Sequence, residues 1–220
     1  MASNSLWRVD LHLHTHHSRD CAVTPRRVVE VARERGLSRI AITDHNSIQG
    51  ALEAKSIAPD FVIVGEEVKT ESGELLAYFI QERIPPGLSL EETARRIRAQ
   101  GGVVGVSHPL DQLRREAVGR EALRRILPLL DCIEVFNSRV IFSSDNARTR
   151  ALAQECGVAG TAGSDAHSTY EIGRAYVEMR AFQSPVEFLE ALREGRTTGR
   201  LSTPLIHIIS TINKLRKRRI

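Results

Sequence analysis

The stretch VDLHLH, residues 9–14, alternates apolar and polar side chains and ends in two histidines. This two-residue period is that of a β-strand, so it sends the apolar residues to one face and His12 and His14 to the other. Two imidazoles on the same side of a strand can bind one metal ion. A single His-X-His pair is more often an ordinary surface or core feature, so the rest of the chain must decide.

Three further histidines follow short apolar or small-residue runs of strand length. They end the stretches IAITDH at 40–45, VVGVSH at 103–108 and TAGSDAH at 161–167. Parallel strands whose carboxyl ends meet at one face would gather all four histidine groups in one basin. Imidazoles and carboxylates gathered there are ligands for divalent transition metals, so the sequence predicts a metal centre.

Helix and strand signals alternate along the whole chain, which is typical of a parallel sheet covered by helices. Helix starts are indicated by Thr24 before Pro25, by Ser47, by Asp145 and by the capping boxes SLEE at 89–92 and SPVE at 184–187. An open sheet brings together only the strands near its switch point, whereas a barrel brings every strand end to one mouth. We therefore predict an α/β fold, a TIM-like barrel with seven or otherwise irregular strands.

The 220 residues fit one domain, with a barrel over residues 1–203 and a C-terminal basic helix or tail over 204–220. In that tail the apolar residues Leu205, Ile208, Ile209 and Ile212 have helical spacing. We expect them to pack on the barrel and the basic run KLRKRR, residues 214–219, to be a solvated end. Removal of residues 214–220 should then leave activity on a small ester unchanged. Binding of the run to nucleic acid or an acidic membrane surface is the alternative.

Net charge is only +4 and much of it lies in this tail, so the barrel itself is close to neutral. The three cysteines, Cys21, Cys132 and Cys156, are odd in number and not paired by spacing, which favours a reducing compartment. No apolar run has membrane-spanning length, and the first residues lack the pattern of a signal peptide. We expect a cytoplasmic protein without a membrane partner; the sequence does not indicate its oligomeric state.

Several motifs occur in the order that is found in one known family. They are DLHLHT at 10–15, SRD at 18–20, IAITDHN at 40–46, GEEV at 65–68, SHP at 107–109 and AGSDAH at 162–167. This series resembles the PHP family, the polymerase and histidinol phosphatase superfamily of metal-dependent phosphoesterases, from about Val9 to Arg174. The resemblance implies a distorted (β/α)7 barrel with two or three divalent ions, Mn, Fe or Zn, in its mouth.

The resemblance also implies a set of metal ligands, namely His12, His14, Asp20, His45, Glu67, Glu74, His108, Asp165 and His167. His12, His14 and Asp165 would hold the first ion. Glu67 would bridge it to a second ion, which His108 also binds.

The remaining ligands complete the second and third sites. Asp20, His45 and His167 would hold the third ion. Glu74 stands where relatives often have a histidine for the second ion, and a carboxylate there favours manganese or iron over zinc. A solvated turn glutamate is the alternative for Glu74. Because Glu66 and Glu67 are adjacent on a strand, they point to opposite faces and only one of them can bridge.

Other side chains could support the ions from outside the ligand set. Asp10 and Asp44 could fix imidazole tautomers, although a plain structural role is equally open. Glu134 could be a further ligand or could orient one.

Four residues near the ligands are candidates for contact with the substrate. Asn46 and Asn137 could line the mouth, and Arg139 could hold two phosphate oxygens or, alternatively, pair with a surface carboxylate. His17 could protonate a leaving group, as could its neighbour His16, or either could be a rim residue.

These features predict hydrolysis of a phosphate ester by a hydroxide held between metal ions, with Glu67, Asp165, Arg139 and His17 as the catalytic residues. The expected substrate is a small phosphorylated molecule, a nucleotide or nucleoside bisphosphate, by family resemblance. Oligonucleotide ends could also enter. The alternatives are a 3′–5′ exonuclease or other nucleic-acid phosphodiesterase, and a catalytically silent metal-binding module. An amidohydrolase would usually need a lysine at a strand end, and only Lys69 is nearby.

Overall fold

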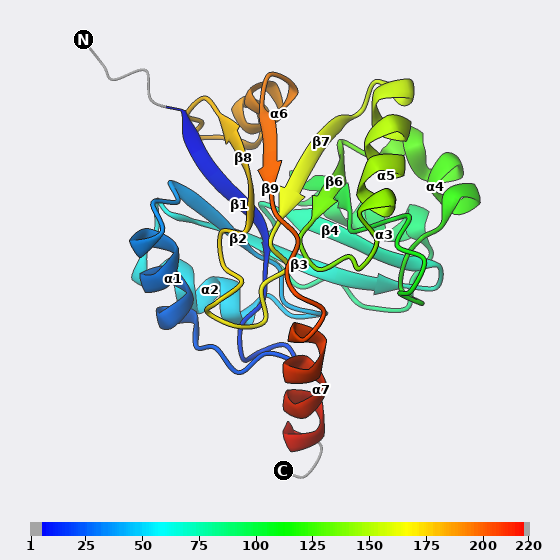
Figure 1. Ribbon diagram of the computed structural model, residues 1–220. Coiled ribbons are helices and arrows are strands. Elements are labelled where there is room, and N and C mark those ends of the chain that lie inside the picture. The colour runs from blue at the N-terminus through cyan, green and yellow to red at the C-terminus, as the bar shows by residue number, and fades with distance from the viewer. Residues whose placement is uncertain (1–5, 218–220) are drawn as a thin grey trace.

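The computed structural model describes residues 6–217, in which strands and helices alternate (Figure 1). In chain order the elements are β1 (Trp7–Leu13), α1 (Pro25–Glu34), β2 (Arg39–Ile42), α2 (Gln49–Ile57), β3 (Val62–Thr70), β4 (Gly73–Tyr78), α3 (Leu90–Ala99), β5 (Val103–Val106), α4 (Arg120–Ile126), the 3₁₀ helix η1 (Leu127–Leu129), β6 (Cys132–Asn137), α5 (Ser143–Cys156), β7 (Ala159–Gly163), β8 (Ala175–Met179), α6 (Pro185–Arg193), β9 (Arg196–Gly199) and α7 (Ile206–Lys217).

Seven strands form a curled sheet in the order β5-β4-β3-β2-β1-β8-β9, and β6 and β7 form a second, parallel pair. This pair lies between β5 and β1. The amide of Asp131 donates to the carbonyl of Val104 at 2.8 Å, and the amide of Asp165 donates to the carbonyl of His12 at 2.8 Å. The sheet and the pair together make a distorted TIM-like barrel, which confirms the predicted fold class.

Two features distort the barrel. β4 runs antiparallel to both β3 and β5, because a tight turn at Gly73 (φ +107°) reverses the chain directly after β3. β8 pairs with the amino-terminal half of β1 in the antiparallel sense, and β9 extends the sheet beyond β8. The strand β9, RTTG, has no apolar pattern and was not predicted from the sequence.

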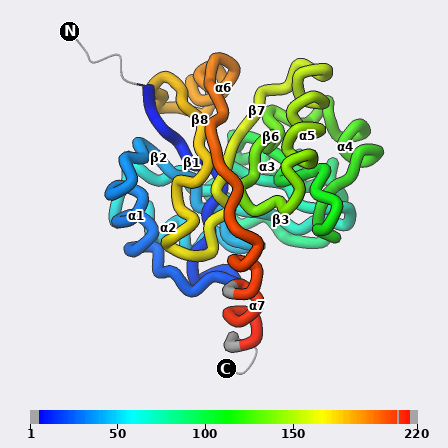
Figure 2. Tube along the Cα trace, in the orientation of Figure 1, coloured from blue at the N-terminus to red at the C-terminus, as the bar shows by residue number. Residues whose placement is uncertain are grey.

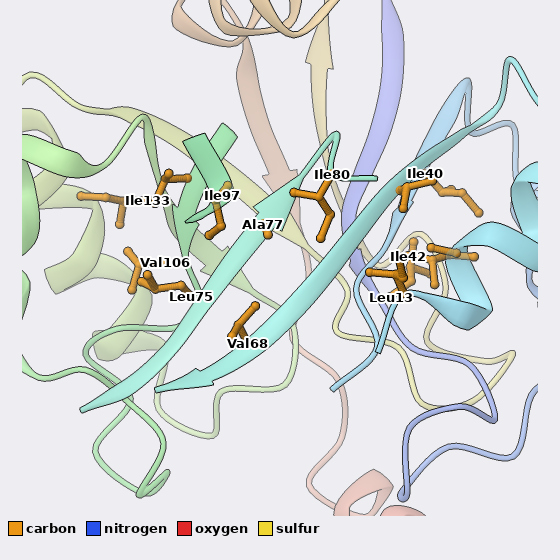
Figure 3. Close-up of a cluster of buried hydrophobic side chains, with 14 of the residues drawn as sticks. Leu13, Ile40, Ile42, Val68, Leu75, Ala77, Ile80, Ile97, Val106 and Ile133 are labelled. Atoms are coloured by element: carbon orange, nitrogen blue, oxygen red, sulfur yellow. The ribbon is translucent and has the colours of Figure 1, made fainter. Parts of the chain in front are cut away.

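The apolar core has two parts on the two sides of the sheet. The outer cluster packs the sheet against the helices, and Figure 3 shows Ile42, Leu75 and Ile97 within it. The inner cluster fills the barrel below the mouth and includes Leu11 and Phe188. Burial of these side chains fixes the strands so that their carboxyl ends stay together.

The register between β1 and β2 shifts between Asp10 and Leu13. As a result Leu11 lies in the inner cluster, whereas Leu13 lies in the outer one. A bulge of this kind re-aims side chains, so His12 and His14 face the mouth although strict alternation from Val9 would not place them there.

Three of the predicted helix caps are confirmed: the side chains of Thr24, Ser89 and Ser184 each accept a hydrogen bond from the amide three residues later. Two other assignments are wrong. Ile48, not Ser47, precedes α2.

Asp145 lies inside the first turn of α5 rather than at its cap. Its carboxylate accepts instead from the amide of Gln112 at 3.2 Å and from the guanidinium of Arg148 at 2.6 Å. The aspartate therefore ties the loop after β5 to α5, a contact that local sequence does not indicate.

Helix α7 lies at the opposite end of the molecule from the start of β1 (Figures 1 and 2). The prediction that its apolar residues pack on the barrel is wrong for Leu205, Ile208 and Ile212, which are 69%, 55% and 44% exposed. Ile206 is buried. The side chain of Ile209 lies outside the described part of the chain.

Candidate metal centre

The predicted ligands come from separate strands and converge at one mouth. They lie on or after β1, β2, β3, β4, β5 and β7, with Glu74 at the start of β4. All except His45 are at least nine-tenths buried: His12, His14, Asp20, Glu67, Glu74, His108, Asp165 and His167. The fold therefore gathers side chains from residues 12 to 167 of the chain.

A first group of ligand atoms surrounds one point. His12 Nε2 lies 3.1 Å from His14 Nε2 and 3.3 Å from Glu67 Oε2. His14 Nε2 lies 3.2 Å from Asp165 Oδ1. Two ligands of one tetrahedral ion, each about 2.1 Å from it, are roughly 3.4 Å apart. These distances fit a single divalent ion.

The two carboxylate oxygens of Glu67 point to different groups of ligand atoms. Its Oε2 belongs to the first group, whereas its Oε1 lies 3.2 Å from His108 Nε2. Glu74 Oε1 lies 3.7 Å from His45 Nδ1 and belongs to a group of potential ligands with His45 and Glu67. The bridging geometry expected of Glu67 is therefore present, and Glu74 reaches the same basin rather than solvent.

A third group lies next to the first. Asp20 Oδ1 is 3.2 Å from His167 Nε2, and Asp20 Oδ2 is 3.7 Å from His45 Nε2. His14, His45 and His167 also have ligand atoms within 4.8 Å of one another. Asp20, His45 and His167 thus have the arrangement required for the third ion.

The chemistry of these side chains fits bound cations. Among residues 6–217 no hydrogen-bond partner reaches either oxygen of Glu67, Asp165 Oδ1, Asp20 Oδ1 or Nε2 of His108. Buried polar atoms without partners are costly, and their lone pairs here converge. Divalent ions between them would satisfy these atoms.

The electrostatics of the basin follow from this crowding. Burial alone would raise the pKa of Glu67, but the imidazoles of His12 and His45 outweigh burial and hold it well below its usual value. His14 has a lowered pKa because it is buried next to His167 and His45. Burial and the charge of Glu67 raise the pKa of Glu74 to about 8.

Glu134 supports the ligands from behind. Its Oε1 lies 2.9 Å from His12 Nδ1, the nitrogen that faces away from the first group, and its Oε2 accepts from the amide of His108 at 2.8 Å. Of the two roles considered for Glu134, the geometry matches orientation of a ligand. Asn137 donates to both Glu134 Oε2 and Asp165 Oδ2, at 3.0 and 3.2 Å.

Asp44 is linked to His14 through the side chain of Ser18. It accepts from the hydroxyl of Ser18 at 2.6 Å, and the same hydroxyl lies 3.0 Å from His14 Nδ1. Asp10 instead accepts from backbone amides, those of Ser164 and Gly173 at 2.9 Å and that of His12 at 3.4 Å. Asp10 therefore joins strands, while Asp44 can fix the orientation of His14.

Glu66 and Glu67 point to opposite faces of β3, as the sequence predicts. Glu66 Oε2 accepts from the amide of Ile84 at 2.8 Å, and burial raises the pKa of Glu66 to about 7. The site residues Asn46, His108 and Asp165 have positive φ values of 52°, 26° and 52°. Such backbone strain in residues other than glycine gathers at functional sites.

A cleft of about 900 Å³ opens over the metal ligands. Its lining includes Asp20, Glu74 and His167 as well as six basic side chains: Arg19, Lys69, Arg83, Arg114, Arg139 and Lys214. A cleft with cations around a ligand basin suits an anionic substrate.

Sequence reasoning missed Arg114. This residue lies in the loop between β5 and α4, and its Nη2 is 2.7 Å from Asp165 Oδ2 and its Nε 3.4 Å from Asp111 Oδ2. The charge of Asp165 outweighs burial and raises the pKa of Arg114. No periodic pattern marks this loop, so only the fold reveals the contact.

Arg139 lines the cleft, but its guanidinium already contacts three other residues. Its Nη2 donates to Ser210 Oγ at 2.7 Å, its Nε is 3.4 Å from Glu171 Oε1, and its Nη1 donates to the carbonyl of Asp165 at 3.4 Å. Binding two phosphate oxygens, as expected from the sequence, would require these contacts to break.

Two further candidates lie on the rim. His17 Nε2 is 3.2 Å from Glu53 Oε2, and its side chain lines the cleft outside the three ligand groups. Asn46 also lines the cleft, but its side-chain oxygen accepts from the amide of Lys69 at 2.9 Å. Asn46 therefore shapes the turn after β2.

The expectation that the basic tail is peripheral is wrong at Lys214. The ammonium group lies 3.1 Å from Asp20 Oδ2 and lines the cleft. The spacing of apolar residues indicated a helix but not which face of that helix meets the barrel.

The fold and the ligand groups define a barrel protein with a site for several divalent ions. The model of the PHP domain matches residues 10–84, and that of the PHP-associated region matches residues 143–197. Two uncharacterized proteins of Methanocaldococcus jannaschii are similar to the chain. One is 39% identical over 145 residues, covering 60% of this chain and 82% of that protein. The other is 33% identical over 196 residues, covering 84% and 79%. The chain belongs to the PHP family.

Solved structures share the fold. A two-domain protein of Bacteroides vulgatus, containing a predicted PHP-like metal-dependent phosphoesterase, has a TM-score of 0.73 at 19% identity, covering 89% of this chain and 65% of that one. The lesion-specific endonuclease EndoQ of Pyrococcus furiosus has a TM-score of 0.61 at 17% identity, covering 90% and 60%. An amidohydrolase of Chromobacterium violaceum has a TM-score of 0.60 at 18% identity, covering 95% and 96%.

None of the helices described between residues 6 and 217 has the length and apolar character needed to span a bilayer. Cys21 and Cys132 are buried, Cys156 is exposed, and none of these three described cysteines forms a disulfide.

Proposed function

We propose that the chain is a phosphoesterase that hydrolyses a phosphate ester of a nucleotide or nucleoside bisphosphate. The observation that carries this proposal is a buried histidine–carboxylate basin that opens into a cleft of about 900 Å³ lined by basic side chains. A nucleotide fits a cleft of this size. We also infer a cytoplasmic location, since none of the three described cysteines forms a disulfide.

His12, His14, Glu67 and Asp165 would hold the first ion, with Glu67 shared with His108 and Glu74 at the second. Asp20, His45 and His167 would hold the third. When bound, Mn, Fe or Zn ions polarise a phosphoryl oxygen and lower the pKa of water. Glu134 orients the imidazole of His12, and Ser18 orients that of His14. Both rings therefore keep facing the catalytic carboxylates Glu67 and Asp165.

We assign the substrate phosphate to Arg114 instead of Arg139. Arg114 pairs with Asp165 among the ligands and with Asp111 in its own loop, and its side chain is 22% exposed, so it can turn toward an anion. Arg139 positions Asp165 and α7 through its existing contacts. His17, paired with Glu53 on the rim, is the candidate proton donor to the leaving group, and Asn137 keeps Asp165 aligned.

A nucleic-acid phosphodiesterase is the second candidate, favoured by the open cleft, its basic rim and the shared fold with an endonuclease. A silent metal-binding module is the third. Phosphate release should be measured across mononucleotides, bisphosphates and labelled oligonucleotides with Mn, Fe or Zn, using a His12→Ala/His14→Ala variant as control. Release from mononucleotides or bisphosphates that the control lacks supports the proposal. Cleavage of oligonucleotides alone favours the second candidate, and binding of metal without any turnover favours the third.

A further inference from the structure

We propose that α7 forms one wall of the substrate cleft and that Lys214 is a substrate-positioning residue that binds an anionic oxygen of the phosphate ester. This inference rests on the proposed function. It concerns a helix outside the family motifs, which end near residue 174, and outside the matched regions, which end at residue 197.

One face of α7 contacts the cleft at Arg139. His207 Nε2 lies 3.2 Å from the carbonyl of Arg139, and Ser210 Oγ accepts from its guanidinium at 2.7 Å. These two helix residues are three apart, so they lie on the same side of the helix. The amino-terminal part of α7 is therefore attached to Arg139, which also donates to the carbonyl of Asp165.

The next turn of the same face contacts Asp20, a candidate ligand of the third ion. Asn213 donates to the carbonyl of Asp20 at 3.2 Å, and Lys214 Nζ lies 3.1 Å from its carboxylate. Ser210 and Lys214 are four residues apart, which continues the same stripe. Four polar contacts from one face of α7 thus end on two residues of the site.

The other face of α7 is apolar and exposed. Ile208, Ile212 and Leu215 are between 44% and 55% exposed, and Leu205, just before the helix, is 69% exposed. An ordinary amphipathic helix turns its apolar face to the core. Apart from Ile206, which is buried in the first turn, the described contacts of α7 with the barrel are polar. Burial of apolar surface therefore explains little of its position, whereas a role at the cleft does.

The charges explain why Lys214 suits a substrate phosphate. Its side chain is 57% exposed, lines the cleft and has Asp20 as its ion-pair partner. A cation held by Asp20, His45 and His167 would take up the charge of that carboxylate and weaken its attraction for the ammonium. Lysine, a point charge on a flexible stem, can then reach a phosphate oxygen next to the ligands.

The experiment compares Lys214→Gln and Lys214→Arg with wild type in the metal-loaded full chain. Calorimetry measures the Kd of inorganic phosphate, and kinetics measure KM and kcat for the phosphate ester that wild type hydrolyses. We expect Lys214→Gln to raise both Kd and KM by about tenfold, to leave kcat within about threefold and to keep the metal content. Lys214→Arg should restore most of the affinity.

Two control variants distinguish the effect of losing the positive charge of Lys214 from the effect of weakening the docking of α7. Lys55→Gln removes one positive charge from a second pocket, at the amino ends of the strands, and should match wild type. Asn213→Ala removes a contact to Asp20 but keeps the ammonium, so it should raise the Kd less than Lys214→Gln does. Equal effects of these two α7 variants would mean that only docking of the helix matters, which overturns the assignment.

Two further outcomes overturn it. Unchanged phosphate affinity and KM in Lys214→Gln would mean that Lys214 does not meet the substrate. A variant that binds more metal with unchanged phosphate affinity would make Lys214 only the counter-ion of Asp20. Failure of wild type to hydrolyse any ester sinks the proposed function, but the phosphate titration still tests Lys214.

Discussion

Glu134 illustrates, at the scale of a single residue, how a carboxylate can matter without touching a metal. It holds His12 through Nδ1 and His108 through its amide. Replacing Glu134 by alanine should lower the affinity for the tightest ion by about 10- to 100-fold, because the ring of His12 loses its orienting partner. Competition with a calibrated chelator measures this affinity. The exposed Glu155→Ala serves as the control, and equal affinities in the two variants would contradict the orienting role.

Arg114 makes a second prediction at this scale. Replacing it by glutamine removes one charge-assisted contact to the phosphoryl group, on the order of 2 kcal/mol of transition-state stabilisation. Each ~1.4 kcal/mol is a factor of ten, so kcat/KM should fall about thirtyfold with metal content retained. Arg115→Gln, an exposed neighbour, is the matched control. Loss of metal in Arg114→Gln would show that the residue only holds Asp165.

The difference between Glu67 and Arg114 shows which residues sequence can locate. Strand parity predicted that only one of Glu66 and Glu67 can bridge, and the resemblance selected Glu67. The structure accordingly turns Glu66 to the amide of Ile84. Arg114 lies in an irregular loop whose side chains are placed by contacts to Asp165 and Asp111. Such contacts join distant parts of the chain, and local pattern does not encode them.

At the scale of an element, β7 ends at Gly163, where the lack of a side chain lets the strand lie against His12. A Cβ added at Gly163 would come within 2.2 Å of the Cβ of His12 and 2.7 Å of Glu134 Oε1. Gly163→Ala should therefore displace His12, with metal affinity falling by at least about tenfold and the free energy of unfolding by about 1–3 kcal/mol.

Gly157→Ala is the comparison for this strand. It has open space around it but a positive φ of 67°, so it should cost only about 1 kcal/mol and leave the metal bound. Denaturant unfolding and metal analysis of both variants measure the difference. Full metal binding by Gly163→Ala would mean that β7 does not constrain His12.

The elements also show where local signals were insufficient. Alternating helix and strand signals predicted a parallel sheet, but the tight turn at Gly73 makes β3 and β4 pair in the antiparallel sense. The spacing of α7 indicated a helix but not its orientation, because Ser210 and Lys214 turn toward the mouth through contacts to Arg139 and Asp20. Periodicity finds helices, whereas tertiary contacts decide which face is buried.

At the scale of the whole molecule, the basin joins strands from both ends of the chain. Without bound ions, buried carboxylates and imidazoles meet with several atoms unpartnered among the described residues. Metal bound only by the folded state should stabilise it by about 2.7 kcal/mol per site at a hundredfold excess over Kd. For a chain of this size one site corresponds to a rise in Tm of roughly 5–10 °C.

The same rise in Tm should depend on pH, because protons compete with metal for the imidazoles. His12 and His45 have raised pKa values: although burial lowers them, the carboxylates around both, led by Glu134 for His12 and Glu67 for His45, outweigh it. These imidazoles therefore bind protons at a higher pH than ordinary histidines do, and the rise produced by Mn²⁺ in chelator-treated protein should shrink as the pH falls from about 8 to about 6. Differential scanning calorimetry measures it, with the His12→Ala/His14→Ala variant as control. A metal-induced rise in Tm that is independent of pH, or undiminished in that variant, would mean that the metal binds away from these imidazoles. The barrel would then hold its strand ends together without the ions that its ligand geometry fits.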